Sequence, residues 1–251
     1  MRRTTIAGTV ALCAMLAAGC AKPPPAKQVL RKSAAVYYKA KTLKIEAENS
    51  QRLQVDKQWQ EKGSLILTEL EKPNKMRQQV VGAKQPSVVS DGQKAYFYMD
   101  QMQSYVQVQP DRLMAGISQD PAGGPVLRFA TDKEPLKDIK GAKLLGDEKI
   151  GEVDTYVVQF TPTTPMRGGL ENAKLSQRLW IGKEDFLVRK TELVAITERD
   201  DKGEKQKFVM TLTSLIKTQD VDATIPASEF TLPKGAKTMQ MPPMPQTPAH
   251  P

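Results

Sequence analysis

Apolar and polar residues alternate along most of the chain beyond residue 42, and a period of two is typical of β-strands with one buried face. Leu43, Ile45 and Ala47 are apolar, and charged residues occupy the positions between them. Most later runs are separated by turn signals such as Asp91-Gly92, which favours an antiparallel meander. The predicted strands cover residues 43–55, 59–69, 75–81, 87–89, 94–98, 104–108, 142–150, 153–161, 173–181, 186–196 and 206–218.

Two segments break this alternation and predict helices. Residues 29–41 carry Leu30, Ala34 and Tyr37 at helical spacing, and residues 111–140 form a helical insertion between two runs of strands. A large sheet with one apolar face needs a cover, and these two segments are the only covers available. We therefore expect a mainly β protein with short helices (α+β), whose strongly curved sheet curls around helical lid elements.

A curled sheet under a small lid either has a packed interior or encloses a cavity for an apolar ligand. The sequence pattern does not decide between these two alternatives. Each candidate residue below could therefore either line a cavity or pack in the core. Within the lid insertion, Gly123-Gly124 has the backbone freedom that suits either a hinge or only a tight turn. The residues expected to line a cavity are Ala47, Trp59, Leu65, Leu67, Met76, Val80 and Phe97 of the sheet and Met114, Ile117, Leu127 and Phe129 of the lid.

The first twenty residues have the organisation of a bacterial export signal. Arg2 and Arg3 precede a short apolar run, and small residues lead from there to Cys20. The segment resembles a lipobox in which Ala17 occupies the usual leucine position and Leu16 lies one place earlier. We therefore expect cleavage after residue 19 and lipidation of Cys20. The alternatives are an ordinary secretory signal and an uncleaved anchor.

The rest of the chain then divides into three parts. Residues 20–27 contain three consecutive prolines and form an extended tether behind the lipid. Residues 28–237 contain all the predicted helices and strands and form one domain. Residues 238–251 are rich in proline, have little to bury, and are expected to be disordered.

Composition limits the chemistry of the protein. The chain has 251 residues with 39% hydrophobic content, which is enough for one or two packed domains. Its single histidine, His250, lies in the Pro-rich tail, which argues against histidine-dependent catalysis and a His-ligated zinc site. Cleavage before Cys20 would leave only that lipidated cysteine. We expect no catalytic residues, no metal and no cofactor, and therefore a protein that is not an enzyme.

The formal net charge of +9 bears on the choice of partner. A basic domain beside anionic headgroups is attracted by about 1 kcal/mol for each suitably placed Lys or Arg, although general solubility is the simpler explanation of the charge. Nucleic acid is a poor partner because the expected location is extracytoplasmic and no basic and aromatic strand pattern is present.

Several short motifs resemble the LolA/LolB superfamily of outer-membrane lipoprotein-sorting proteins. The resemblance implies an unclosed antiparallel sheet, or half-barrel, with an apolar cavity that holds acyl chains, such as palmitate, of a lipid or lipoprotein. The motifs are Lys41-Thr42-Leu43, Lys72-Pro73-Asn74-Lys75-Met76-Arg77, Ser90-Asp91-Gly92 with Tyr96-Phe97-Tyr98, the run from Leu179 to Lys190 and the run from Ile225 to Pro233.

The resemblance also implies a role. With its lipobox, the chain is similar to the membrane-anchored members that transport or sort lipids and lipoproteins in the bacterial envelope. Ala21, in place of an aspartate after the cysteine, resembles the signal for the outer membrane facing the periplasm. The alternative is a structural or signalling envelope lipoprotein, similar to RseB-like sensors, that binds a protein partner.

Overall fold

The computed structural model describes residues 23–55, 58–82, 86–111, 113, 117, 124–163, 172–201 and 204–239. Its strands form one twelve-stranded sheet in the order β12-β6-β5-β4-β3-β2-β1-β11-β10-β9-β8-β7. The strands are β1 (Thr42–Val55), β2 (Gln58–Glu71), β3 (Lys75–Val80), β4 (Ser87–Asp91), β5 (Ala95–Met99), β6 (Ser104–Val108), β7 (Ile139–Ile150), β8 (Val153–Pro162), β9 (Lys174–Gly182), β10 (Val188–Asp201), β11 (Glu204–Val221) and β12 (Lys237–Thr238).

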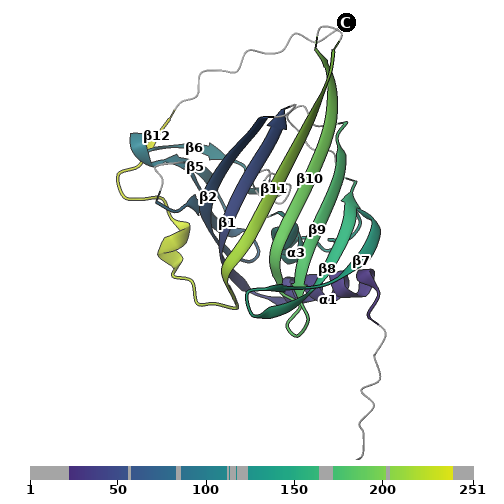
Figure 1. Cartoon of the computed structure of the whole chain (residues 1–251). Coiled ribbons are helices and arrows are strands. Elements are labelled where there is room, and N and C mark those ends of the chain that lie inside the picture. Colours follow the sequence, from purple (N-terminus) through teal and green to yellow (C-terminus); the bar gives the residue numbers. More distant parts are fainter. Residues whose placement is uncertain are drawn as a thin grey trace, which may run out of the picture.

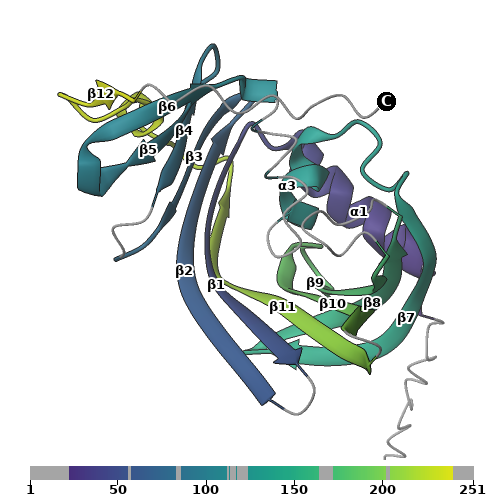
Figure 2. The same ribbon diagram turned by 90° about the horizontal axis from the view of Figure 1, so that it is seen from above.

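The sheet is strongly curved and does not close, because β12 and β7 remain its two edges (Figure 1). Seen from above, it bends around the helices, which lie on its concave side (Figure 2). Register shifts between Glu46 and Ala47 and between Val188 and Lys190 bend the long strands locally, and the twist of each strand adds to the curvature. The prediction of a mainly β protein with a curved, unclosed sheet is confirmed.

The pairing of β1 determines which residues face the concave side. Ala47 lies opposite Ile66 of β2 and opposite Ile216 of β11. Because side chains alternate between the two faces, Leu43 and Ile45 share the concave face with Ala47, and all three are buried. The charged residues between them point to the opposite, outer face.

Helix α1 (Ala26–Lys39) begins directly after Pro25, three residues earlier than predicted. Alanine and polar residues fill its first turn, so apolar spacing alone does not mark that turn. The buried positions of the helix include Val29, Leu30 and Tyr37, which form a stripe against the concave face. At its C-terminus, the Lys72 ammonium donates hydrogen bonds to the carbonyls of Tyr37 and Tyr38 at 3.1 and 2.6 Å. These bonds satisfy carbonyls that a helix end leaves without partners.

The predicted insertion is helical in the parts that the structure describes. Residues 110, 111, 113 and 117 have helical conformation, and helix α3 (Gly124–Thr131) follows. Helix α3 is buried on nearly all sides, and its Phe129 ring lies 6.4 Å from the ring of Tyr37. The insertion ends earlier than predicted, because β7 begins at Ile139. Two short 3₁₀ turns complete the fold, η1 (Asp100–Met102) and η2 (Ala227–Phe230).

Features at the open edges of the sheet disfavour pairing with strands of other chains. The pairing of β7 with β8 is irregular in two places, close to Gly141 and Gly146, which have positive φ angles. This strand also carries exposed lysines, including Lys143. Bulges and lysines both disfavour the addition of a further strand. At the other edge, β12 pairs in parallel with the first two residues of β6.

Candidate functional site

The space between α3 and the centre of the concave face is the candidate site. On one side lie Val126 and Leu127 of α3, and on the other lie strands β1, β2, β3, β10 and β11. A cavity of about 30 Å³ separates them, which is room for one or two water molecules and not for an acyl chain. Its lining residues are Ile45, Ala47, Asn49, Ile66, Thr68, Gln78, Val126, Leu127, Thr191, Ser214 and Ile216.

The floor of this cavity mixes apolar and polar side chains. Ile45, Ala47 and Ile216 provide an apolar surface, and Gln78 donates a hydrogen bond to the Thr68 hydroxyl at 3.3 Å beside it. In the described structure, the buried side-chain oxygen of Asn49 has no hydrogen-bond partner. A buried polar atom without a hydrogen-bond partner is costly. The hydrogen-bonding groups in this part of the floor are therefore less completely satisfied than those of an ordinary packed core.

The backbone of helix α3 lies nearest to that of α1 and farther from every strand of the sheet. Arg128, on α3, is partly buried, and the side-chain Nε atom has no partner in the described structure. Burial lowers the pKa of the Arg128 guanidinium, and the nearby Asp138 and Asp132 counteract that shift. The lid helix therefore carries one buried polar atom that is not satisfied within the described structure.

Two of the predicted cavity residues line this cavity, and three others are packed in the core beside it. Ala47 and Leu127 line the cavity itself. Met76, Ile117 and Phe129 are buried in the hydrophobic core around it. Two further candidates, Met114 and Gly123, lie outside the described residues, whereas Gly124 is the first residue of α3.

The register of β2 corrects the expectation for three other residues. Ile66 pairs with Ala47 on the concave face, so Leu65 and Leu67 point to the outer face. Trp59 shares that outer face and is 50% exposed, with the Arg52 guanidinium over its ring. Residues 65–67 are all apolar, so alternation alone does not show which of them faces inward.

Val80 and Phe97 lie on the concave side but away from the lid. Val80 pairs with Ile66 at the last position of β3 and is only partly buried. Phe97 pairs with the buried Val88, yet 41% of its surface is exposed. Neither residue lines the cavity under α3, and Val80 is also among the residues that line a larger hollow near η2.

Sequence reasoning missed nine of the eleven lining residues, mainly because the strands that contribute them are far apart in the chain. Ile45 could have been found from its alternation with Ala47. Ile66, Ile216 and Val126 join the site only through strand register and helix packing, which the pattern does not specify.

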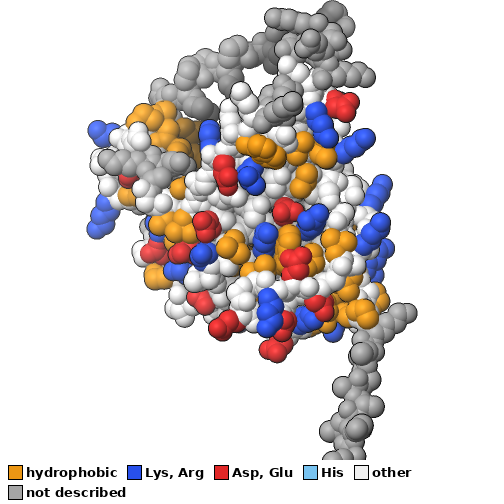
Figure 3. All heavy atoms as spheres, in the orientation of Figure 1, with side chains coloured by type: hydrophobic (Ala, Val, Ile, Leu, Met, Phe, Trp, Pro, Cys, Tyr) orange, Lys and Arg blue, Asp and Glu red, His pale blue; other side chains and the backbone are white. Residues whose placement is uncertain are grey.

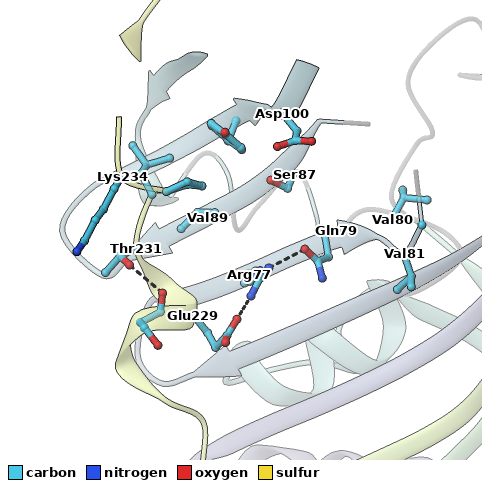
Figure 4. Close-up of a pocket in the computed structure, with 15 residues that line it drawn as sticks. Arg77, Gln79, Val80, Val81, Ser87, Val89, Asp100, Glu229, Thr231 and Lys234 are labelled. Atoms are coloured by element: carbon cyan, nitrogen blue, oxygen red, sulfur yellow. Dashed lines mark hydrogen bonds and ion pairs between the residues drawn. The ribbon is translucent and has the colours of Figure 1, made fainter. Parts of the chain in front are cut away.

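A larger hollow lies on the outer face, beneath the C-terminal segment (Figure 4). Its volume is about 620 Å³, and it runs between η2 and strands β3, β4 and β5. Arg77 spans it to form an ion pair with Glu229, and Asp100 and Lys234 also line it. This outer groove is too polar to be a first choice for acyl chains.

The described residues contain neither a helix suited to crossing a membrane nor a metal-binding cluster. None of the helices there is long and apolar enough to cross a membrane. No cluster of three or more His, Cys, Asp and Glu side chains in the same part of the chain has the arrangement to hold a metal ion.

An open, curved antiparallel sheet with short helices against its concave face is the architecture that the resemblance to the LolA/LolB superfamily implied. The chain belongs to the DUF2092 family of predicted periplasmic proteins, whose model matches residues 26–241. The match begins at the first residue of α1 and includes every strand of the sheet. An extracytoplasmic location agrees with this family description.

Solved structures similar to this chain include a LolA superfamily protein from Nitrosomonas europaea, with 12% identity, a TM-score of 0.35 and coverage of 83% of this chain and 98% of that one. LprF from Mycobacterium bovis has 14% identity, a TM-score of 0.43 and coverage of 85% and 100%. The Pseudomonas aeruginosa MucA/MucB complex has 12% identity, a TM-score of 0.39 and coverage of 82% and 60%. No curated protein matches the sequence.

Proposed function

We propose that the protein is a non-enzymatic carrier that binds acyl chains of a lipid or lipoprotein between α3 and the concave face of the sheet. The observation that carries this proposal is the small cavity beneath α3, a helix whose backbone lies closer to α1 than to the sheet. Movement of this lid away from Ala47 and Ile216 would enlarge the existing space without breaking a strand pairing.

The concave face continues as an apolar surface beyond the lid. Leu212 of β11 pairs with Leu193 of β10, and Met210 pairs with Ala195 in the next row of the same face. Leu193 and Ala195 are already buried, so an acyl chain would reach these apolar rows only by displacing the groups that cover them. Burial of one methylene contributes about 0.8 kcal/mol, so about ten methylenes match the roughly 8 kcal/mol of a micromolar complex.

A fluorescent fatty-acid analogue tests the site with the chain that begins at residue 21, which retains all of α1. We expect saturable uptake at ~micromolar concentration for this protein. Ala47→Phe should weaken uptake by roughly tenfold or more, because the cavity has no room for the ring and overpacking there costs about 1–3 kcal/mol. The matched control is Glu48→Phe, on the next residue of β1 but on the exposed outer face.

Equal uptake by both variants would contradict acyl-chain binding in the cavity under α3. Thermal unfolding of each variant separates a filled pocket from a lost fold, and only a variant that still unfolds cooperatively counts. Mass spectrometry of the protein purified from its own envelope provides an independent test, because a carrier should retain co-purifying lipid.

We propose the same lipidated anchor that the sequence predicts, at Cys20, with the domain facing the periplasm from the outer membrane. Cys20→Ser should release the protein from envelope membranes or leave an unprocessed precursor. Normal processing and membrane attachment of this variant would contradict lipidation at Cys20.

The alternative function is binding of a protein partner, and the outer groove supports it. This groove offers Arg77, Asp100 and Lys234 beside apolar residues, a mixture suited to a peptide. MucB, one of the similar structures, is named in a complex with MucA. Absence of any saturable lipid uptake, together with a specific protein captured by this domain but not by a variant with Lys234→Glu, an exposed residue of the groove, would favour the alternative.

A further inference from the structure

The exposed face of α1 is basic along its length. Lys27, Arg31, Ala35 and Lys39 follow one another at intervals of four residues, so they form one stripe, and all four are exposed. Tyr38 lies beside this stripe with 47% of its surface exposed. Residues 26–39 contain no aspartate or glutamate. A helix face with cations, an exposed aromatic ring and no acid is suited to an anionic membrane surface.

A groove of about 410 Å³ adjoins this stripe. It lies between α1 and the turn that follows α3, with Ala34, Ala35 and Leu136 among its apolar lining residues. Arg31, Lys133 and Lys137 also line the groove, together with one acidic side chain, that of Glu134. Lys137 pairs with Asp132 at 3.7 Å, so the cations that remain for a ligand are chiefly Arg31 and Lys133.

The outer face of the sheet is different in its charge pattern. Figure 3 shows Lys and Arg interspersed with Asp and Glu over this face of the molecule. Many of those charges are paired, as in Lys217 with Glu48 and Arg178 with Glu192. Within the described residues, Lys27, Arg31 and Lys39 form no ion pair, so their charges are not neutralised by a neighbour.

The position of this stripe in the chain favours a bilayer as its partner. Only six peptide units separate Cys20, the predicted lipidation site, from Ala26 at the start of α1. Even a fully extended chain of that length spans only about 20 Å, so an anchor at Cys20 would hold α1 close to the headgroups. Attraction of polybasic segments to anionic lipids acts over about one Debye length, roughly 8 Å at physiological salt.

We propose that the basic stripe of α1 and the adjoining groove form a docking surface for a bilayer with anionic headgroups. The cations of the stripe bind headgroup phosphates, Tyr38 lies at the interface, and the groove receives the upper part of one lipid. This surface is distinct from the cavity under α3. The docked orientation presents the lid end of the domain, where α1 and the turn after α3 lie, to the membrane.

Vesicle flotation tests the docking surface with the unanchored chain that begins at residue 21 and contains every described element. Phosphatidylcholine vesicles with and without phosphatidylglycerol are compared. We expect binding only to the anionic vesicles, lost at high salt. The triple variant Lys27→Gln, Arg31→Gln, Lys39→Gln should lower the partition coefficient on the order of 10- to 100-fold.

The charge-matched control is Lys62→Gln, Lys174→Gln, Lys207→Gln. These three lysines are exposed and lie within the first five residues of β2, β9 and β11. Those strands begin at the end of the sheet opposite α1 (Figure 1). The control should bind anionic vesicles within about threefold of the unmodified chain. Equal losses in both triple variants would show that overall charge and not the α1 face governs binding, and would overturn the proposal. Absence of any preference for phosphatidylglycerol in the unmodified chain would overturn it as well.

Unchanged uptake of the fatty-acid analogue is the expected second result for the α1 triple variant. Uptake is proposed to take place under α3. Loss of uptake in the Ala47→Phe variant, with normal uptake in the α1 triple variant, would show that the acyl site and the docking surface are distinct. Loss of both activities in the α1 triple variant, with cooperative unfolding preserved, would contradict an independent docking surface.

Discussion

The Tyr37 hydroxyl donates a hydrogen bond to the Gln219 side-chain oxygen at 2.7 Å, although the two residues are 182 positions apart in the chain. The same hydroxyl accepts a hydrogen bond from the Val188 backbone N–H at 2.9 Å. The Gln219 amide in turn donates to the Val188 carbonyl at 2.8 Å. This network attaches α1 to β10 and β11, so α1 is the fixed part of the helical cover and α3 packs against it.

Tyr37→Phe should reduce the free energy of unfolding by roughly 1–3 kcal/mol, because it leaves the buried Val188 N–H without its acceptor. For a domain of this size, that change lowers the melting temperature by several degrees. Tyr38→Phe is the control, since Tyr38 is exposed on the neighbouring position of the same helix. Thermal unfolding of the two variants measures the difference. Equal stability of both variants would show that the buried network contributes nothing.

The same tyrosine predicts a dependence of stability on alkaline pH. Burial raises the pKa of Tyr37 well above its usual value of 10.0. Above pH 10, the unfolded chain therefore loses the phenol proton while the folded chain retains it, and stability falls as pH rises. The fall attributable to Tyr37 approaches about 1.4 kcal/mol per pH unit.

Urea unfolding between pH 8 and pH 11.5, at roughly half-unit steps, measures this contribution. Tyr37→Phe should lack this part of the slope, whereas other groups, such as Lys72, whose pKa burial lowers, remain common to both proteins. Parallel stability curves for the two proteins above pH 10 would contradict the assignment.

Arg77 connects the C-terminal segment to a buried carboxylate of the sheet. This side chain pairs with Glu229 and lies 3.9 Å from the carboxylate of Glu69, whose side chain is only 2% exposed. Arg77→Met should destabilise the protein by roughly 1–3 kcal/mol, because the buried Glu69 would retain only Lys44 as a partner. Glu229→Gln should cost less than about 1 kcal/mol, because Arg77 would keep Glu69. Denaturant unfolding measures the free energy of unfolding of both variants. Equal losses of stability in Arg77→Met and Glu229→Gln would contradict this ranking.

The hinge prediction concerns the entry to α3. Gly123→Ala with Gly124→Ala should slow both uptake and release of the acyl analogue if this glycine pair permits the lid to move. The melting temperature should change by only a few degrees, which corresponds to about 1 kcal/mol or less. Stopped-flow fluorescence measures the two rates. Unchanged rates in the stably folded double variant would mean that the glycines serve only a turn.

The class of fold was already evident in the sequence. The alternation of Leu43, Ile45 and Ala47 identified the buried face of β1, and eleven predicted segments correspond to eleven strands of the sheet. Helical spacing identified α1, and the predicted insertion contains α3. These predictions succeeded because local backbone geometry imposes the same period on residues that are neighbours in the chain.

Only the tertiary structure decided which residues meet in the site. Residues 65–67 are all apolar, so the choice of Ile66 as the inward residue depends on hairpin register. Ile216 pairs with Ala47 although the two strands are far apart in the sequence. The hydrogen bond between Tyr37 and Gln219 likewise joins residues 182 positions apart. The amount of space under α3 depends on how side chains from five strands and one helix pack together. Register and packing are properties of contacts between distant segments, and no local period specifies them.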